Sequence, residues 1–120
     1  MRLSFALAIV IGLAAVAGCG KKQGQLSGTV TFQGKPVPDG EIMLTPDDKR
    51  GNQGPGVLVA IKDGKFQTPT TRGHWGGAYL ATISGYRGTD TLFSNYEMQI
   101  ELPEGDATYD FEIPASAVGR

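Results

Sequence analysis

Few side chains in this sequence can take part in bond-making chemistry. Cys19 is the only cysteine and His74 the only histidine among the 120 residues. A nucleophilic mechanism needs a nucleophile beside a base such as histidine, and a zinc site needs three or four histidine, cysteine or carboxylate ligands. One cysteine and one histidine supply neither set. The sequence therefore predicts a non-catalytic protein without a metal or other cofactor, and leaves Cys19 and the surroundings of His74 as candidate sites.

Cys19 follows an apolar N-terminal segment. The run from Leu3 to Gly18 carries no charge and comes directly after Met1-Arg2. It is shorter than the roughly 20 residues of a comfortable membrane span, and its basic start and small final residues are typical of a secretory signal peptide. Val16-Ala17-Gly18-Cys19 resembles a bacterial lipobox. This resemblance implies a signal peptide over residues 1–18 and a diacylglycerol and acyl (palmitate-type) anchor on Cys19.

The chemistry of the residue suits such an anchor, because a thiolate is the strongest nucleophile among the common side chains and several acyl chains together hold a protein stably on a membrane. The alternative is an ordinary cleaved signal peptide with a cysteine nearby by chance. Residues 19–25 are predicted to be a short polar tether, in which Lys21 and Lys22 either touch anionic headgroups or are solvated. Gly20 stands where aspartate favours inner-membrane retention in well-studied lipoproteins, so the resemblance implies the outer membrane, facing the periplasm.

The loop from Thr70 to Gly77 holds the only tryptophan, the only histidine and an arginine within four positions. Tryptophan and arginine are the residue types most enriched at binding hot spots. We therefore predict that Trp75, helped by Arg72 and His74, forms a contact patch for an envelope protein or a wall polymer. The alternative is that Trp75 is a packing residue covering one end of the domain.

Acidic residues are the other candidates for chemistry, and they stand at predicted turns: Asp39 with Glu41, Asp47 with Asp48, Asp90, and Glu104 with Asp106. Calcium would suit such loops, but turn acids more commonly bind their own backbone. The 11 basic and 12 acidic residues balance, so the sequence offers no electrostatic footprint for nucleic acid.

The chain from Leu26 alternates apolar and polar residues, as half-buried strands do. Gly makes up 18 of 120 residues, which disfavours helices. Turn signals separate seven predicted strands: 26–33, 41–45, 57–61, 66–68, 79–84, 98–102 and 109–113. Leu92, Phe93 and Tyr96 fall at helical spacing and predict a helical turn. The predicted core comprises Val30, Phe32, Ile42, Leu44, Val59, Ile61, Phe66, Tyr79, Ile83, Ile100, Tyr109 and Phe111.

Such spacing favours an all-β, antiparallel two-sheet sandwich over residues 26–114, with 115–120 as a C-terminal tail. Four segments, 27–40, 62–66, 77–83 and 108–113, together resemble the carboxypeptidase regulatory-like, or transthyretin-like, domains of secreted bacterial lipoproteins. The resemblance implies a seven-stranded prealbumin-like sandwich, related in architecture to immunoglobulin-like domains, without catalytic residues. The ending Ala-Val-Gly-Arg lacks the Tyr-Arg-Gly-Ser of the hydroxyisourate hydrolases in the transthyretin-related group.

The sequence thus predicts a non-catalytic lipoprotein, attached to the membrane through Cys19, whose β domain is a structural or binding module of the cell envelope. The alternative function is a small envelope enzyme that uses loop carboxylates or a loop-bound metal.

Overall fold

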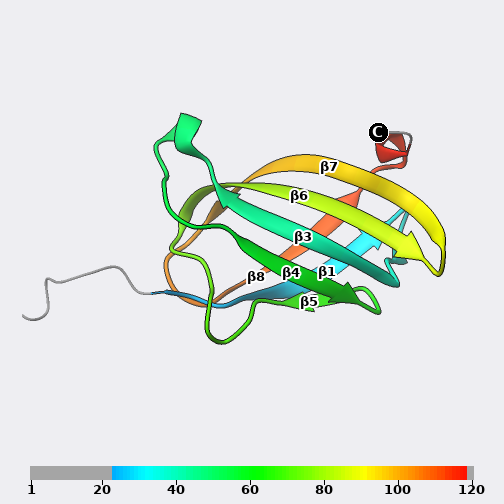
Figure 1. The fold of residues 1–120 in the computed structure, drawn as a ribbon, viewed down its shortest axis with the longest axis horizontal. Coiled ribbons are helices and arrows are strands. Elements are labelled where there is room, and N and C mark those ends of the chain that lie inside the picture. Colours follow the sequence, from blue (N-terminus) through cyan, green and yellow to red (C-terminus); the bar gives the residue numbers. More distant parts are fainter. Residues whose placement is uncertain (1–22, 119–120) are drawn as a thin grey trace, which may run out of the picture.

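Strands make up most of the computed structural model, which describes residues 23–118 (Figure 1). The strands are β1 (Leu26–Phe32), β2 (Lys35–Pro36), β3 (Asp39–Pro46), β4 (Val57–Lys62), β5 (Lys65–Gln67), β6 (Gly77–Arg87), β7 (Asp90–Leu102) and β8 (Ala107–Ile113). Two short 3-10 helices are η1 (Asp48–Arg50) and η2 (Ala115–Ala117). The predicted signal peptide, Cys19 and both lysines of the tether lie outside the described residues. Within residues 23–118, no helix has the length and apolarity to cross a membrane.

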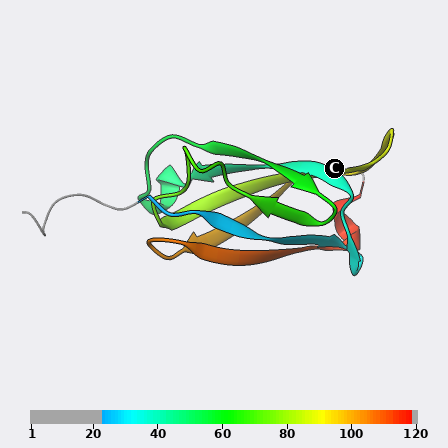
Figure 2. The same ribbon diagram turned by 90° about the horizontal axis from the view of Figure 1, so that it is seen from below.

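The strands form one curled sheet. Its hydrogen-bonded path runs β2-β1-β5-β4-β3-β6-β7, and β8 pairs with β1 beside this path. All neighbours are antiparallel except β1 and β8, which run parallel along their whole length. In Figure 1, β1 and β8 pass behind β3 and β6. Figure 2 shows from below that these two parts of the sheet, β1 with β8 and β3 with β6, face each other as its two flanks. The inner face of the curled sheet therefore encloses the core.

The two ends of this elongated domain differ in their loops. One end carries loops 47–56, 68–76 and 103–106 beside Gly24, where the described chain enters the fold. We call it the N-terminal pole. The opposite end carries turns 33–34, 63–64 and 88–89 together with η2, and we call it the C-terminal pole (Figure 1). Residues that are far apart in the sequence thus meet at the N-terminal pole.

The core follows the alternation of the sequence closely. Ten of the twelve predicted core residues are buried, whereas Phe32 and Tyr109 are half-buried and pack against the cluster. The predicted core leaves out nine further buried hydrophobic residues: Leu26, Val37, Val57, Ala78, Ala81, Phe93, Leu102, Ile113 and Ala117. Ala117 lies within the predicted C-terminal tail, so part of that tail packs onto the domain as η2.

The prediction of a helical turn around Leu92, Phe93 and Tyr96 is wrong, because β7 continues through all three residues. Asn95 has a left-handed backbone (φ 55°), and the register between β6 and β7 shifts at this point. Such a bulge inserts one extra residue. Before the bulge Phe93 faces the core, and after it the inward positions are the even-numbered residues from Tyr96 to Leu102. The step of three residues from Phe93 to Tyr96 is what resembles helical spacing in the sequence.

Two further features depart from the predicted antiparallel set of seven strands. Lys35 and Pro36 form β2 by pairing with the end of β1, so the segment predicted as a plain turn adds a strand and buries Val37 completely. In addition, β8 lies parallel to β1. Parallel neighbours need a long connection between them, and here almost the whole domain forms that connection.

Replacing Phe93 tests the bulge. Its ring is 1% exposed and lies 5.1 Å from the ring of Phe32, so we expect Phe93→Ala to lower the free energy of unfolding by about 3–5 kcal/mol. Leu58→Ala is the control, because Leu58 is 53% exposed and such a surface change alters stability by less than about 0.5 kcal/mol. Urea unfolding of both variants gives the comparison. Equal losses would contradict the burial of Phe93.

Candidate functional site

His74 lies inside the N-terminal pole. Its backbone forms a two-way pair with Gly24: the Gly24 N–H donates to the His74 carbonyl at 2.8 Å, and the His74 N–H donates to the Gly24 carbonyl at 2.9 Å. The imidazole is 0% exposed. Its Nδ1 accepts from the Gly76 N–H at 3.0 Å, which places the proton of the neutral ring on Nε2. Position 74 therefore joins the incoming chain to the loop ahead of β6.

Burial sets the ionisation of this histidine. It lowers the pKa of His74 below its ordinary value of 6.5, although the Gly105 carbonyl and the Asp106 carboxylate oppose the shift. Nε2 finds no hydrogen bond of good geometry within residues 23–118. A proton added to Nδ1 would also displace the Gly76 donor, since a charged imidazole has no acceptor. The folded state thus favours neutral His74.

The three residues predicted to form a contact patch are separated by this arrangement. His74 packs edge-on to Tyr79, with ring centroids 6.4 Å apart, and it does not reach the surface. Arg72 is exposed and Trp75 is half-buried. The Trp75 backbone N–H donates to the Tyr79 hydroxyl at 3.0 Å, which restrains the backbone that carries the indole. His74 therefore positions the loop, and the contact role predicted for it is corrected, whereas a contact by Arg72 and Trp75 is still a prediction.

The loop after β3 is hydrogen-bonded to β6 and β7 at the same pole. Asp47 is buried and accepts from the Lys49 N–H and from Arg50 Nε, and this bond with Arg50 lowers the pKa of the Asp47 carboxyl. Arg50 also donates to the carbonyls of Tyr79 and Ile100, at 2.9 and 3.3 Å. This loop and Trp75 border a hollow of about 300 Å³, which Glu101 and Glu104 also line.

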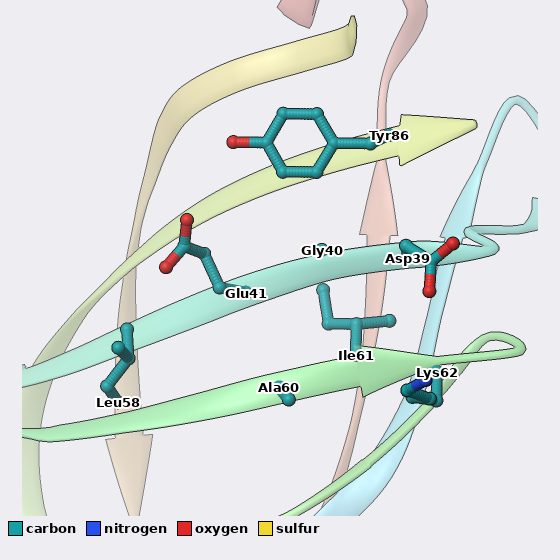
Figure 3. A pocket seen from close by; sticks show the side chains of 8 residues that line it. All are labelled: Asp39, Gly40, Glu41, Leu58, Ala60, Ile61, Lys62 and Tyr86. Atoms are coloured by element: carbon teal, nitrogen blue, oxygen red, sulfur yellow. The ribbon is translucent and has the colours of Figure 1, made fainter. Parts of the chain in front are cut away.

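Two shallow grooves cross the outer face of the sheet. One, of about 510 Å³, lies over β3, β4 and β6 (Figure 3). Asp39 and Lys62 flank it on one side, and Glu41, Leu58 and the Tyr86 ring border the rest. The other, of about 530 Å³, lies over β1, β4 and β5 and shares Ala60 and Lys62 with the first. Ala60 and Lys62 therefore lie between the two grooves and border both. No sequence signal marked them, because their lining comes from five strands.

The acids predicted at turns do not assemble into a metal site. Asp47 is engaged with Arg50, and the Asp106 carboxylate accepts from the Gln25 N–H at 2.9 Å. Within the described part of the chain, no three histidine, cysteine or acidic side chains are grouped so that they could hold a metal ion. Asp47 thus binds the backbone two residues on, as turn-forming acids do, whereas Asp106 holds the distant segment that precedes β1.

Comparisons with known proteins show the fold alone. No family model matches the sequence, and no curated protein matches it. Among solved structures, a DUF3823 family protein from Parabacteroides merdae is similar, with a TM-score of 0.52 and 18% identity. The match covers 78% of this chain and 47% of that one, so the chain spans about half the length of its structural neighbour. It shares an all-β architecture with that protein.

Acid should destabilise the domain through His74. Because the folded-state pKa is lowered, the unfolded chain takes up a proton first, so stability is full above about pH 6.5 and declines as pH falls below that value. His74→Asn keeps an acceptor near the position of Nδ1 and cannot titrate. We expect the variant to be less stable at pH 7.5 and its melting temperature to change less between pH 7.5 and 5. Parallel pH profiles for the two proteins would contradict this assignment.

Proposed function

We propose that the protein is a non-catalytic lipoprotein held on a membrane through Cys19, with its β domain serving as a structural or binding module of the cell envelope. The observation that carries the proposal is the segment Val16-Ala17-Gly18-Cys19 at the end of an uncharged run. The backbone pair at Gly24 supports it, because the folded domain then begins a few residues after the lipid-bearing position.

The architecture we propose is a transthyretin-like sandwich. The supporting features are the curled sheet with facing flanks (Figure 2) and the pairing of the first long strand with the last one. The similar DUF3823 family protein supports an all-β fold of this kind at the level of backbone shape. A domain of this type acts through its loops and outer strand faces, which a rigid inner core holds in place.

We further propose the outer membrane, on its periplasmic side, as the location. The residue after the lipid-bearing cysteine is Gly20, and not the aspartate that favours retention in the inner membrane. Partners of such a module are envelope proteins or wall polymers. The exposed Arg72 and the half-buried Trp75 at the N-terminal pole are its proposed contact residues.

Replacing Cys19 tests the anchor. We expect Cys19→Ala to move the protein from the membrane fraction to the soluble fraction, because a protein without acyl chains has no stable hold on the bilayer. Cell fractionation measures the shift, and mass spectrometry of the wild-type protein measures the lipid. A control, Lys21→Ala with Lys22→Ala, removes both charges of the tether and should stay membrane-bound.

The proposal fails if the Cys19→Ala variant still sediments with membranes and wild-type Cys19 carries no modification. The enzyme alternative has a separate test. Metal analysis of the purified protein and a broad hydrolase screen should both be negative for a binding module.

A further inference from the structure

The N-terminal pole is the part of the domain nearest to position 19. A fully extended chain spans at most about 3.6 Å per residue, so the five residues from Cys19 to Gly24 reach no farther than about 18 Å. Gly24 is paired on both backbone groups with His74, and Trp75 follows directly in the chain. Covalent geometry and one backbone pair thus tether the Trp75 loop close to the anchoring residue.

The same end presents the residue type suited to a membrane surface. Trp75 is the only tryptophan in the chain, and tryptophan is enriched at the headgroup level of bilayers because its ring is both apolar and able to donate a hydrogen bond. Exposed residues 69–72 precede it, among them Arg72. Hydrogen bonds hold the loop that carries this side chain: the Trp75 N–H donates to the Tyr79 hydroxyl, and the Gly76 N–H donates to buried His74.

From this geometry we propose that Trp75 and Arg72 contact the lipid headgroups of the membrane that holds Cys19, with the long axis of the domain directed away from the bilayer. This inference rests on the proposed lipid anchor and names the occupant of the contact patch as the bilayer surface. A protein or a wall polymer in the same place is the competing outcome of the test.

The charges of the described residues at the N-terminal pole, apart from the two tether lysines, do not drive this contact. Lys49, Arg50 and Arg72 at the N-terminal pole are matched by Asp48, Glu104 and Asp106, and the Arg50 guanidinium is also paired with Asp47. Electrostatic attraction to anionic lipids needs an excess of cations near the surface. The contact should therefore depend on the indole and change little with salt.

The single tryptophan makes the proposal directly measurable. Full-length lipidated protein is reconstituted into vesicles of phosphatidylethanolamine and phosphatidylglycerol that include a phosphatidylcholine spin-labelled or brominated near its headgroup. Flotation isolates the membrane-bound protein, and tryptophan emission is then recorded with and without the labelled lipid. We expect the emission to be quenched by the label and to lie at shorter wavelength than in detergent-free Cys19→Ala protein.

A matched variant reports on the opposite end of the domain. Trp75→Phe combined with Val118→Trp moves the fluorophore to the C-terminal pole, at a position that is 56% exposed and so accepts the larger ring. Its emission should be insensitive to the labelled lipid. Equal quenching of both proteins would overturn the proposed orientation.

The outcomes separate the two proposals. If wild-type protein does not float with vesicles, the lipid anchor fails. If it floats and Trp75 emission is unchanged by the labelled lipid, the anchor stands and the membrane contact is overturned, which leaves the loop to a protein or polymer partner.

Discussion

The domain depends on the pairing of β1 with strands on both of its edges. β5 takes one edge in antiparallel register, and β8 takes the other in parallel register over seven consecutive pairs. Gly28 marks the point of closest approach, because a Cβ there would collide with the Tyr109 carbonyl. Without β8 along this edge, the curled sheet would be open beside Val30, which is fully buried and pairs with Phe111 of β8.

The same strand determines where the candidate site lies. Because β1 begins at the N-terminal pole, the residues just ahead of it must meet the loops of that pole. Gly24 pairs there with His74, and Gln25 donates to Asp106. The position of Trp75 thus follows from the point at which the chain enters the sheet. The two outer grooves, in contrast, lie on the side of the sheet and are formed by strands alone (Figure 3).

Alternation along the chain was sufficient to predict the all-β class and most of the core, because burial on one face of a strand repeats every second residue. It could not predict the position of Phe93, since a bulge at Asn95 changes the phase within one strand. Nor could it predict Val37, whose burial depends on the short pairing of β2 with β1.

The sequence could indicate which residues belong to the candidate site, but not how their side chains are arranged. The rarity of His74 and Trp75 drew attention to the loop from Thr70 to Gly77. Which of the two side chains points inward is decided by tertiary contacts with Gly24, Gly76 and Tyr79, and no local pattern encodes such contacts. The resemblance of Val16-Ala17-Gly18-Cys19 to a lipobox is a different kind of signal, because it concerns a linear recognition motif that needs no fold to be identified.

The bulge in β7 also bears on how the protein behaves at high local concentration. Within residues 23–118, β7 ends the path of the sheet and pairs only with β6. A long, flat edge of this kind is a template on which a second chain can add a strand and begin aggregation. The left-handed backbone of Asn95 interrupts the thirteen-residue edge, and Glu97 and Glu101 place like charges along its exposed positions. The irregularity that brings Phe93 into the core therefore also breaks the continuity of this edge, which is one of the ways in which natural sheets avoid edge-to-edge pairing.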